Sequence, residues 1–115
     1  MKFNVSSTQL FGQLTAVSRV IASKNSLQIL EDVLFDLNGN VLTLTASDGE
    51  TTIRTSLDVE NAEGAGKVAI GAKLLIETLK EYSEQPLTFT IGEENFAVTM
   101  VSQNGTYSFV GVNGN

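Results

Sequence analysis

The sequence predicts a single α+β domain in which both helices pack on one face of antiparallel sheet. Two stretches repeat apolar residues with a helical period, and most other apolar residues alternate with a period of two. The turn Asn38-Gly39-Asn40 joins two alternating stretches, which indicates an antiparallel hairpin because Asn and Gly both tolerate positive φ. A chain of 115 residues fits one domain and can bury a core without disulfides or metals.

The chain begins with a strand followed by an amphipathic helix. The strand "KFNV" covers residues 2–5, and Ser6 or Ser7 then offers a hydroxyl group to cap the helix. The helix is predicted over residues 8–22, with an apolar stripe made of Leu10, Leu14, Val17 and Ile21. The opposite face is small and uncharged except for Arg19 near the C-terminal end, where a cation also suits the helix dipole.

Four strands are predicted next, because the period of the apolar residues changes to two. They cover residues 31–37, 41–47, 51–60 and 67–70. The segment "NAEGAG" at residues 61–66 is predicted to be a loop.

A second helix is predicted over residues 72–83, and Pro86 is expected to end it. Its inner stripe consists of Ala72, Leu75, Leu79 and Tyr82, and its outer stripe consists of Lys73, Glu77 and Lys80. Three strands at residues 87–91, 95–100 and 106–112 complete the order β-α-β-β-β-β-α-β-β-β. The two halves have similar element orders, although no sequence repeat is detectable. The last strand, over residues 106–110, is expected to lie at a sheet edge.

The charge distribution indicates one surface that is cleared of negative charge. The chain carries 13 Asp and Glu against 7 Lys and Arg, yet residues 1–30 contain no acidic residue. About three would be expected there at the average density of the chain. Arg19 and Lys24 both lie in this acid-free stretch. The predicted strands and their loops hold most of the acidic residues, so the sheets are expected to be acidic and the helices about neutral or slightly basic.

Composition argues against most catalytic and metal sites. The chain has no Cys and no His, which removes thiolate nucleophiles, disulfides, nearly all zinc chemistry and the commonest general base. Asp48-Gly49-Glu50 fits a turn better than a cation site because the other ligands of a calcium loop are missing. Asp32 and Asp36 are better explained as solvated surface residues. We therefore expect no catalytic residue, no metal and no cofactor.

Neither a signal peptide nor a transmembrane segment is predicted. The N-terminus "MKFNVSSTQL" lacks an apolar core, and no apolar run approaches the length that spans a bilayer. The absence of Cys suits a cytoplasmic protein, and no contact with a membrane is expected.

The sequence resembles a known family over essentially its whole length. The segments "MKFNV", "ASKNSLQIL", "DVLFDLNGNVLTLTASDGETTIRTSL", "GKVAIGAKLLIETLKEY" and "TYSFVGV" occur in the order seen in the first domain of the bacterial DNA polymerase III beta subunit, the sliding clamp. The resemblance implies a DNA-clamp-like fold for residues 1–115, as the first of three domains, with the later domains absent from this chain. It also implies a non-catalytic processivity factor, in which two chains close a head-to-tail ring around double-stranded DNA and tether the replicative polymerase.

The resemblance assigns roles to particular residues. In the family the helices line the central hole, so Arg19, Lys24, Lys73 and Lys80 are expected to face DNA without reading its sequence. Lys73, Tyr107 and Phe109 fall near the edge that meets the third domain of the second subunit. DNA polymerase III and the clamp loader are expected to bind through the domains that are absent here.

Each assignment has a simpler alternative. Arg19 and Lys24 could be a dipole-compensating cation and a solvated loop lysine. Lys73 and Lys80 could pair along the helix with Glu77 and Glu84 at i, i+4 spacing.

Tyr107 and Phe109 point to the same face of their strand, which fits either a core or an interface. The alternative function is a small acidic α+β protein-interaction module with no DNA role.

Overall fold

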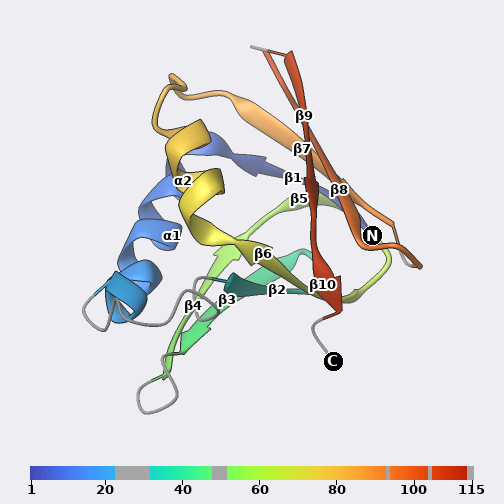
Figure 1. Ribbon diagram of the computed structural model, residues 1–115. Coiled ribbons are helices and arrows are strands. Elements are labelled where there is room, and N and C mark those ends of the chain that lie inside the picture. Colours follow the sequence, from blue (N-terminus) through green and yellow to red (C-terminus); the bar gives the residue numbers. More distant parts are fainter. Residues whose placement is uncertain (23–31, 48–51, 93, 104, 114–115) are drawn as a thin grey trace.

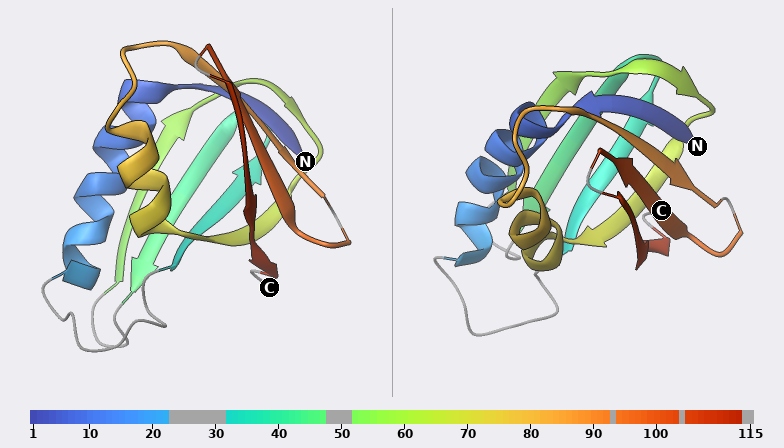
Figure 2. Two further views of the ribbon diagram at one scale, coloured as in Figure 1. Left: turned by 45° about the horizontal axis from the view of Figure 1, so that its top comes forward. Right: turned by 90° about the horizontal axis from the view of Figure 1, so that it is seen from above.

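The computed structural model describes residues 1–22, 32–47, 52–92, 94–103 and 105–113. In these residues, ten strands form two five-stranded antiparallel sheets, and two helices lie side by side along one side of the molecule (Figures 1 and 2). Helix α1 covers Ser7–Ala22, and helix α2 covers Ala72–Leu79. The predicted α+β class and the side-by-side placement of the helices are confirmed.

The strand order of the two sheets places most sequence neighbours in hairpins. The first sheet has the order β5-β1-β7-β8-β9, formed by Glu60–Glu63, Lys2–Ser6, Pro86–Ile91, Ala97–Ser102 and Gly105–Val110. The second sheet has the order β10-β6-β2-β3-β4, formed by Val112–Asn113, Gly66–Gly71, Asp32–Asn38, Val41–Ser47 and Thr52–Asp58. The predicted hairpin at Asn38 is confirmed, with Asn38 opposite Val41 and Gly39 at a φ of 61°.

The core lies between the sheets and beneath the helix pair. Phe3 stacks on Phe89 at a ring-centroid distance of 5.2 Å, and Phe35 of the other sheet lies 6.4 Å from Phe89. Helix α1 packs against β3 and β4, while α2 packs against α1 and β6. The predicted inner stripes are buried at Leu10, Leu14, Val17, Ala72, Leu75 and Leu79. The side chain of Ile21 lies outside the described part of the chain. No helix in the described residues is long and apolar enough to cross a membrane.

Helix α2 is shorter than its sequence pattern predicts. It ends at Leu79, where the sequence predicts a helix over residues 72–83. The hydrogen bond from Lys80 N–H to the Ile76 carbonyl is followed by tighter bonds from Glu81 to Thr78 and from Tyr82 to Leu79. These i→i−3 bonds close the last turn, as is common at helix ends. Pro86 does not end the helix, because it is the first residue of β7.

Two short strands were not predicted. Strand β5 begins at the end of the predicted strand 51–60 and covers the first half of the predicted loop at residues 61–66. Strand β10 begins at the end of the predicted strand 106–112 and is separated from β9 by Gly111. Strand β5 pairs with β1 at the sheet edge, and none of its residues is buried. Its sequence "ENAE" shows no apolar alternation, since Ala62 is its one side chain that packs against the core.

The two halves of the chain share one topology. The first unit contains β1 to β5 and the second contains β6 to β10. If each strand is replaced by its counterpart five numbers away (β1 by β6, β2 by β7 and so on), the strand order of one sheet becomes that of the other. Helix α1 then corresponds to α2, and edge strand β4 corresponds to edge strand β9. The domain is thus built from two equivalent units, each of which supplies one edge strand to each sheet.

Candidate functional site

The start of helix α1 is fixed by hydroxyl groups. The side chain of Ser6 accepts a hydrogen bond from the N–H of Gln9 at 3.3 Å, which is the geometry of an N-cap and confirms the predicted cap. Farther along the helix, Gly12 and Ala16 are exposed on the face opposite the core. Arg19 lies within the helix, but its side chain and the whole of Lys24 lie outside the described part of the chain.

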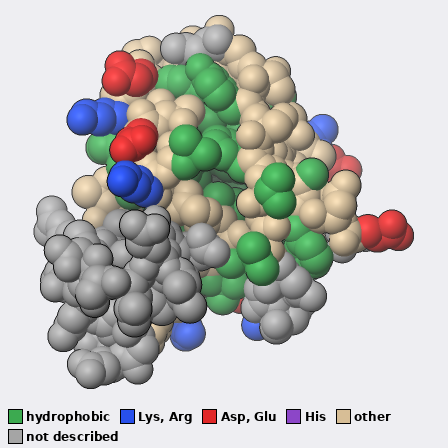
Figure 3. Space-filling view, viewed as in Figure 1, with side chains coloured by type: hydrophobic (Ala, Val, Ile, Leu, Met, Phe, Trp, Pro, Cys, Tyr) green, Lys and Arg blue, Asp and Glu red, His purple; other side chains and the backbone are tan. Residues whose placement is uncertain are grey.

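Helix α2 and the residue that caps its C-terminal end present two of the predicted basic residues to solvent. Lys73 and Lys80 are exposed, as is Glu77 between them, while the buried residues lie on the other side of the helix. Figure 3 shows basic and acidic side chains interspersed over this helix. The outer stripe has two lysines and one glutamate, so its net charge is slightly positive.

Glu84 has a different partner from the one that helical spacing suggested. Because α2 ends at Leu79, Glu84 does not follow Lys80 on the helix. Its carboxylate accepts hydrogen bonds from Ser6 Oγ at 2.6 Å, Thr8 Oγ1 at 2.8 Å and Ser7 Oγ at 3.3 Å. The bonds from Ser6 and then Thr8 are the main causes that lower the pKa of Glu84 to about 2. The carboxylate thus joins the start of α1 to the segment after α2.

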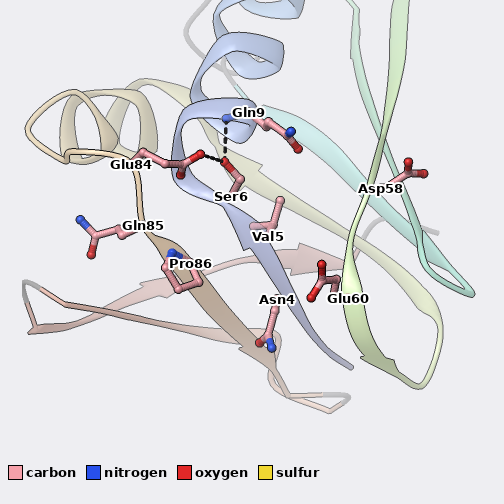
Figure 4. A pocket seen from close by; sticks show the side chains of 9 residues that line it. All are labelled: Asn4, Val5, Ser6, Gln9, Asp58, Glu60, Glu84, Gln85 and Pro86. Atoms are coloured by element: carbon pink, nitrogen blue, oxygen red, sulfur yellow. Dashed lines mark hydrogen bonds between the residues drawn. The ribbon is translucent and has the colours of Figure 1, made fainter.

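A hollow of about 370 Å³ lies beside this carboxylate, as Figure 4 shows. Its lining includes Asp58 and Glu60, which lie on the far side from Glu84. Three carboxylates around one hollow repel phosphate groups, so this surface is not suited to DNA. In the described residues, no group of three or more Asp, Glu, His or Cys side chains is placed to hold a metal ion.

Strand β9 is an outer strand of its sheet, which confirms the prediction of an edge strand. Tyr107 lies opposite Met100, and Phe109 lies opposite Val98. Met100 and Val98 are fully buried, so both aromatic side chains continue the core face toward the edge. Phe109 packs partly against the core, whereas Tyr107 is 41% exposed. The core face thus extends to an exposed rim at Tyr107 and Phe109. The role of this pair in a subunit interface stays a prediction.

Tyr82 connects the end of α2 to this rim. Its ring lies 6.2 Å from the ring of Tyr107, and its hydroxyl group accepts a hydrogen bond from Ser102 Oγ at 3.3 Å. Burial is the largest cause that raises the pKa of Tyr82, and the neighbouring Tyr107 acts in the same direction. The segment after α2 and the β8–β9 hairpin therefore meet through side chains.

Exposed apolar residues that the sequence analysis did not single out lie on the same elements. Leu74 of α2 is 57% exposed, Val110 of β9 is 84% exposed, and Val112 of β10 is 57% exposed. Figure 3 shows hydrophobic side chains gathered around a hollowed region between α2 and β9. Leu74 could have been found from the sequence, because a helix that buries Ala72, Leu75 and Leu79 turns the preceding leucine about 100° away from the core.

Some sequence predictions fall outside the described residues or remain without a contact to test them. The turn at residues 48–50 lies outside the described part of the chain, as does the side chain of Asp32. Asp36 lies in β2 opposite Thr43 and Lys67, at a half-buried position. A lysine on the neighbouring strand is consistent with an ordinary surface role for this aspartate.

Comparison with known proteins identifies relatives over almost the whole chain. Residues 1–113 match the family model described as DNA polymerase III beta subunit, N-terminal domain. A beta sliding clamp homolog from Streptomyces muensis is 30% identical over 93 residues, which cover 81% of this chain and 25% of the relative. The beta sliding clamp of Pseudomonas aeruginosa is 25% identical over 114 residues, covering 90% of this chain and 31% of the relative.

Solved structures give the same result. A sliding clamp, DNA polymerase III subunit beta, from Bartonella birtlesii superposes with a TM-score of 0.86 at 26% identity, over 99% of this chain and 30% of that one. The DNA polymerase III subunit beta of Pseudomonas aeruginosa superposes with a TM-score of 0.87 at 21% identity, over 100% of this chain and 31% of that one. The chain thus spans less than a third of the length of these relatives.

Proposed function

The chain belongs to the family described as DNA polymerase III beta subunit, N-terminal domain, and we propose that it acts as a domain of a processivity factor. Residues 1–115 act as the first of three domains in a clamp subunit. Two subunits form a ring around double-stranded DNA, and the ring tethers the replicative polymerase. The domain has no catalytic role and acts in the cytoplasm.

The observation that carries this proposal is the pair of equivalent edge strands, β4 and β9. Each is an outer strand of its sheet, longer than the edge strand at the other end of that sheet, β10 or β5, and the internal symmetry of the domain makes β4 and β9 counterparts. An edge strand can accept another strand through its free backbone groups. A domain with two such edges can be joined on both sides, which is what a domain within a closed ring requires.

We propose that DNA faces the helices rather than the sheets. Lys73 of α2 and Lys80 directly after it are exposed, and the exposed positions Gly12 and Ala16 leave the outer face of α1 small. Arg19 and Lys24 complete this surface in the proposal. Such contacts attract phosphates without reading bases, which leaves the ring free to slide.

The second subunit docks at Lys73 and at the rim that contains Tyr107 and Phe109. The exposed apolar residues Val110 and Val112 lie on the same stretch of chain and suit an interface that excludes water. The partner contributes its third domain, and the contact is head-to-tail. DNA polymerase III and the clamp loader bind through the other domains of the clamp.

Primer extension on a long single-stranded template tests this function. The clamp that carries this domain, loaded on the primed template, should lengthen the products made by the polymerase in one binding event. Products that stay short with the clamp present would overturn the proposal. If the chain also captured a protein partner with no effect on synthesis, the interaction module would be the better description.

A further inference from the structure

The segment between α2 and β7, residues 80–85, contacts the β8–β9 hairpin at two points. The side chain of Gln85 accepts a hydrogen bond at Oε1 from the backbone N–H of Gln103, at 2.7 Å. Three residues earlier, the hydroxyl group of Tyr82 accepts a bond from Ser102, and its ring lies beside that of Tyr107. Both contacts reach the end of the hairpin at which β8 leads into β9.

The same segment is fixed on its other side to the start of α1. Ser7 N–H donates to the Gln85 carbonyl at 3.0 Å, and Gln85 N–H donates to Ser7 Oγ at 3.0 Å. Ser7 Oγ also donates to the Ser83 carbonyl at 3.1 Å, and Gln85 Nε2 donates to the same carbonyl at 3.2 Å. Ser7 and Gln85 are each only 2% exposed. A buried glutamine whose side-chain amide is hydrogen-bonded through both its oxygen and its nitrogen has little freedom to change rotamer.

This arrangement matters because β9 has a sheet neighbour on one side only. Its backbone is paired with β8, and its other edge is free in the described structure. An edge strand that is held in place before binding loses less conformational entropy when another strand pairs with it. The contacts of residues 80–85 with the hairpin therefore favour the pairing of β9 with a strand of another chain, although they do not touch that chain.

We propose that Gln85 and Tyr82 are positioning residues, which hold the β8–β9 hairpin against the segment after α2 so that β9 presents a fixed edge to the second subunit. The inference rests on the proposed function, because it assigns β9 to the subunit contact. It adds two residues that the comparison with the family did not indicate. Neither needs to contact the partner, since each acts through Gln103, Ser102 or Tyr107.

Amide hydrogen exchange tests the contact directly. In Gln85→Ala, the Gln103 amide loses its acceptor, and its protection should fall about fivefold to tenfold relative to core amides such as Phe89. Gln103→Ala is the matched control, because the donor is a backbone N–H and survives the change of side chain. Tyr82→Phe removes only a hydroxyl group, and it should produce a smaller loss of protection confined to the hairpin.

Some exchange results would overturn the proposal. One is unchanged protection of the Gln103 amide in Gln85→Ala. Another is a combined result in which Gln85→Ala lowers the protection of the Gln103 and Phe89 amides equally, and Tyr82→Phe lowers no protection within the hairpin. The first outcome would show that the bond does not hold the hairpin, and the second that these residues contribute only to global stability.

Subunit association in the full clamp separates this inference from the proposed function. Gln85→Ala and Tyr82→Phe should weaken association in sedimentation velocity, while Gln103→Ala should not. Tyr107→Asp places a charge on the rim itself and should abolish association. If Tyr107→Asp has no effect, the proposed interface is wrong. If Tyr107→Asp abolishes association but Gln85→Ala changes neither exchange nor association, the interface stands and the positioning role is wrong.

Discussion

Gly111 shows how one residue limits the path of the chain between the two sheets. It lies between β9 and β10, and its N–H donates to the Phe96 carbonyl at 2.9 Å. A Cβ atom at this position would lie 2.5 Å from Val68 Cγ2, 3.0 Å from the Phe96 carbonyl oxygen and 3.3 Å from the Ala69 carbonyl oxygen. Ala69 belongs to the paired strand β6, and the Phe96 carbonyl holds the N–H of Gly111 itself, so these two backbone atoms have little room to move.

We therefore predict that Gly111→Ala lowers the free energy of unfolding by about 1–3 kcal/mol, the usual cost of overpacking. Gly12→Ala is the matched control, because a Cβ atom there meets nothing within 4 Å. In the middle of α1 this substitution should raise stability by about 0.5–1 kcal/mol. Urea unfolding of both variants checks the pair, and equal effects of the two substitutions would contradict this account.

The lowered pKa of Glu84 predicts how the stability of the fold depends on pH. Its pKa in the folded chain is about 2, below its ordinary value of 4.5, because hydroxyl groups of Ser6 and Thr8 hydrogen-bond the charged form. A lowered folded-state pKa adds stability that is fully present above pH 4.5 and is lost as the pH falls toward 2. The stability difference between the native chain and Glu84→Gln should therefore shrink over that range in urea unfolding. A difference that stays constant from pH 7 to 2 would show that the charge is not involved.

Among the elements, helix α2 buries one leucine in the core and exposes the adjacent leucine to solvent. Leu75 is fully buried and Leu74 is 57% exposed. We predict that Leu75→Ala lowers stability by about 2–5 kcal/mol, whereas Leu74→Ala changes it by less than about 0.5 kcal/mol. Thermal unfolding of the two variants checks this. A large loss for Leu74→Ala would mean that α2 is rotated so that Leu74 faces the core.

The elements also show what the sequence could predict and what it could not. Long elements with buried faces, such as α1 and the β2–β3 hairpin, are predictable because burial imposes a period on their residues. The two missed strands, β5 and β10, correspond to each other in the internal symmetry, and both are short edge strands. Their place depends on pairing with β1 and β6, which are distant in sequence, so no local pattern marks them.

The candidate site follows the same division. The exposure of Lys73 and Lys80 and the edge position of Tyr107 followed from the helical period and the resemblance. The role of Glu84 did not, because the early end of α2 moves it from a helical pair with Lys80 to the hydroxyl groups of Ser6 and Thr8. Gln85 was also not predictable, since its partner lies 18 residues away and is a backbone group.

At the scale of the whole molecule, the net charge of −6 limits what one domain can do with DNA. The chain alone should bind duplex DNA weakly and without sequence preference, because it cannot encircle the duplex. Each phosphate contact contributes a salt slope of about −0.9, so binding through two contacts should fall roughly tenfold between 50 and 200 mM salt. Fluorescence anisotropy with a labelled duplex measures this. Tight binding that is insensitive to salt would contradict a sliding role.

In the assembled clamp, the same residues act together across several domains, and their local concentration at the DNA is fixed by the ring. Reversing the charge at Arg19 and Lys24, as Arg19→Glu with Lys24→Glu, should therefore shorten the products of primer extension by the full clamp. The matched control is Lys2→Glu with Lys67→Glu, which changes the net charge equally but acts on strands β1 and β6.

If the helix pair faces DNA, only the first pair of substitutions should impair extension, and thermal unfolding should confirm that both variants are folded. Equal impairment by the two pairs would mean that net charge matters rather than position. Unaltered extension in the first variant would remove the DNA-facing role from α1 and the residues that follow it.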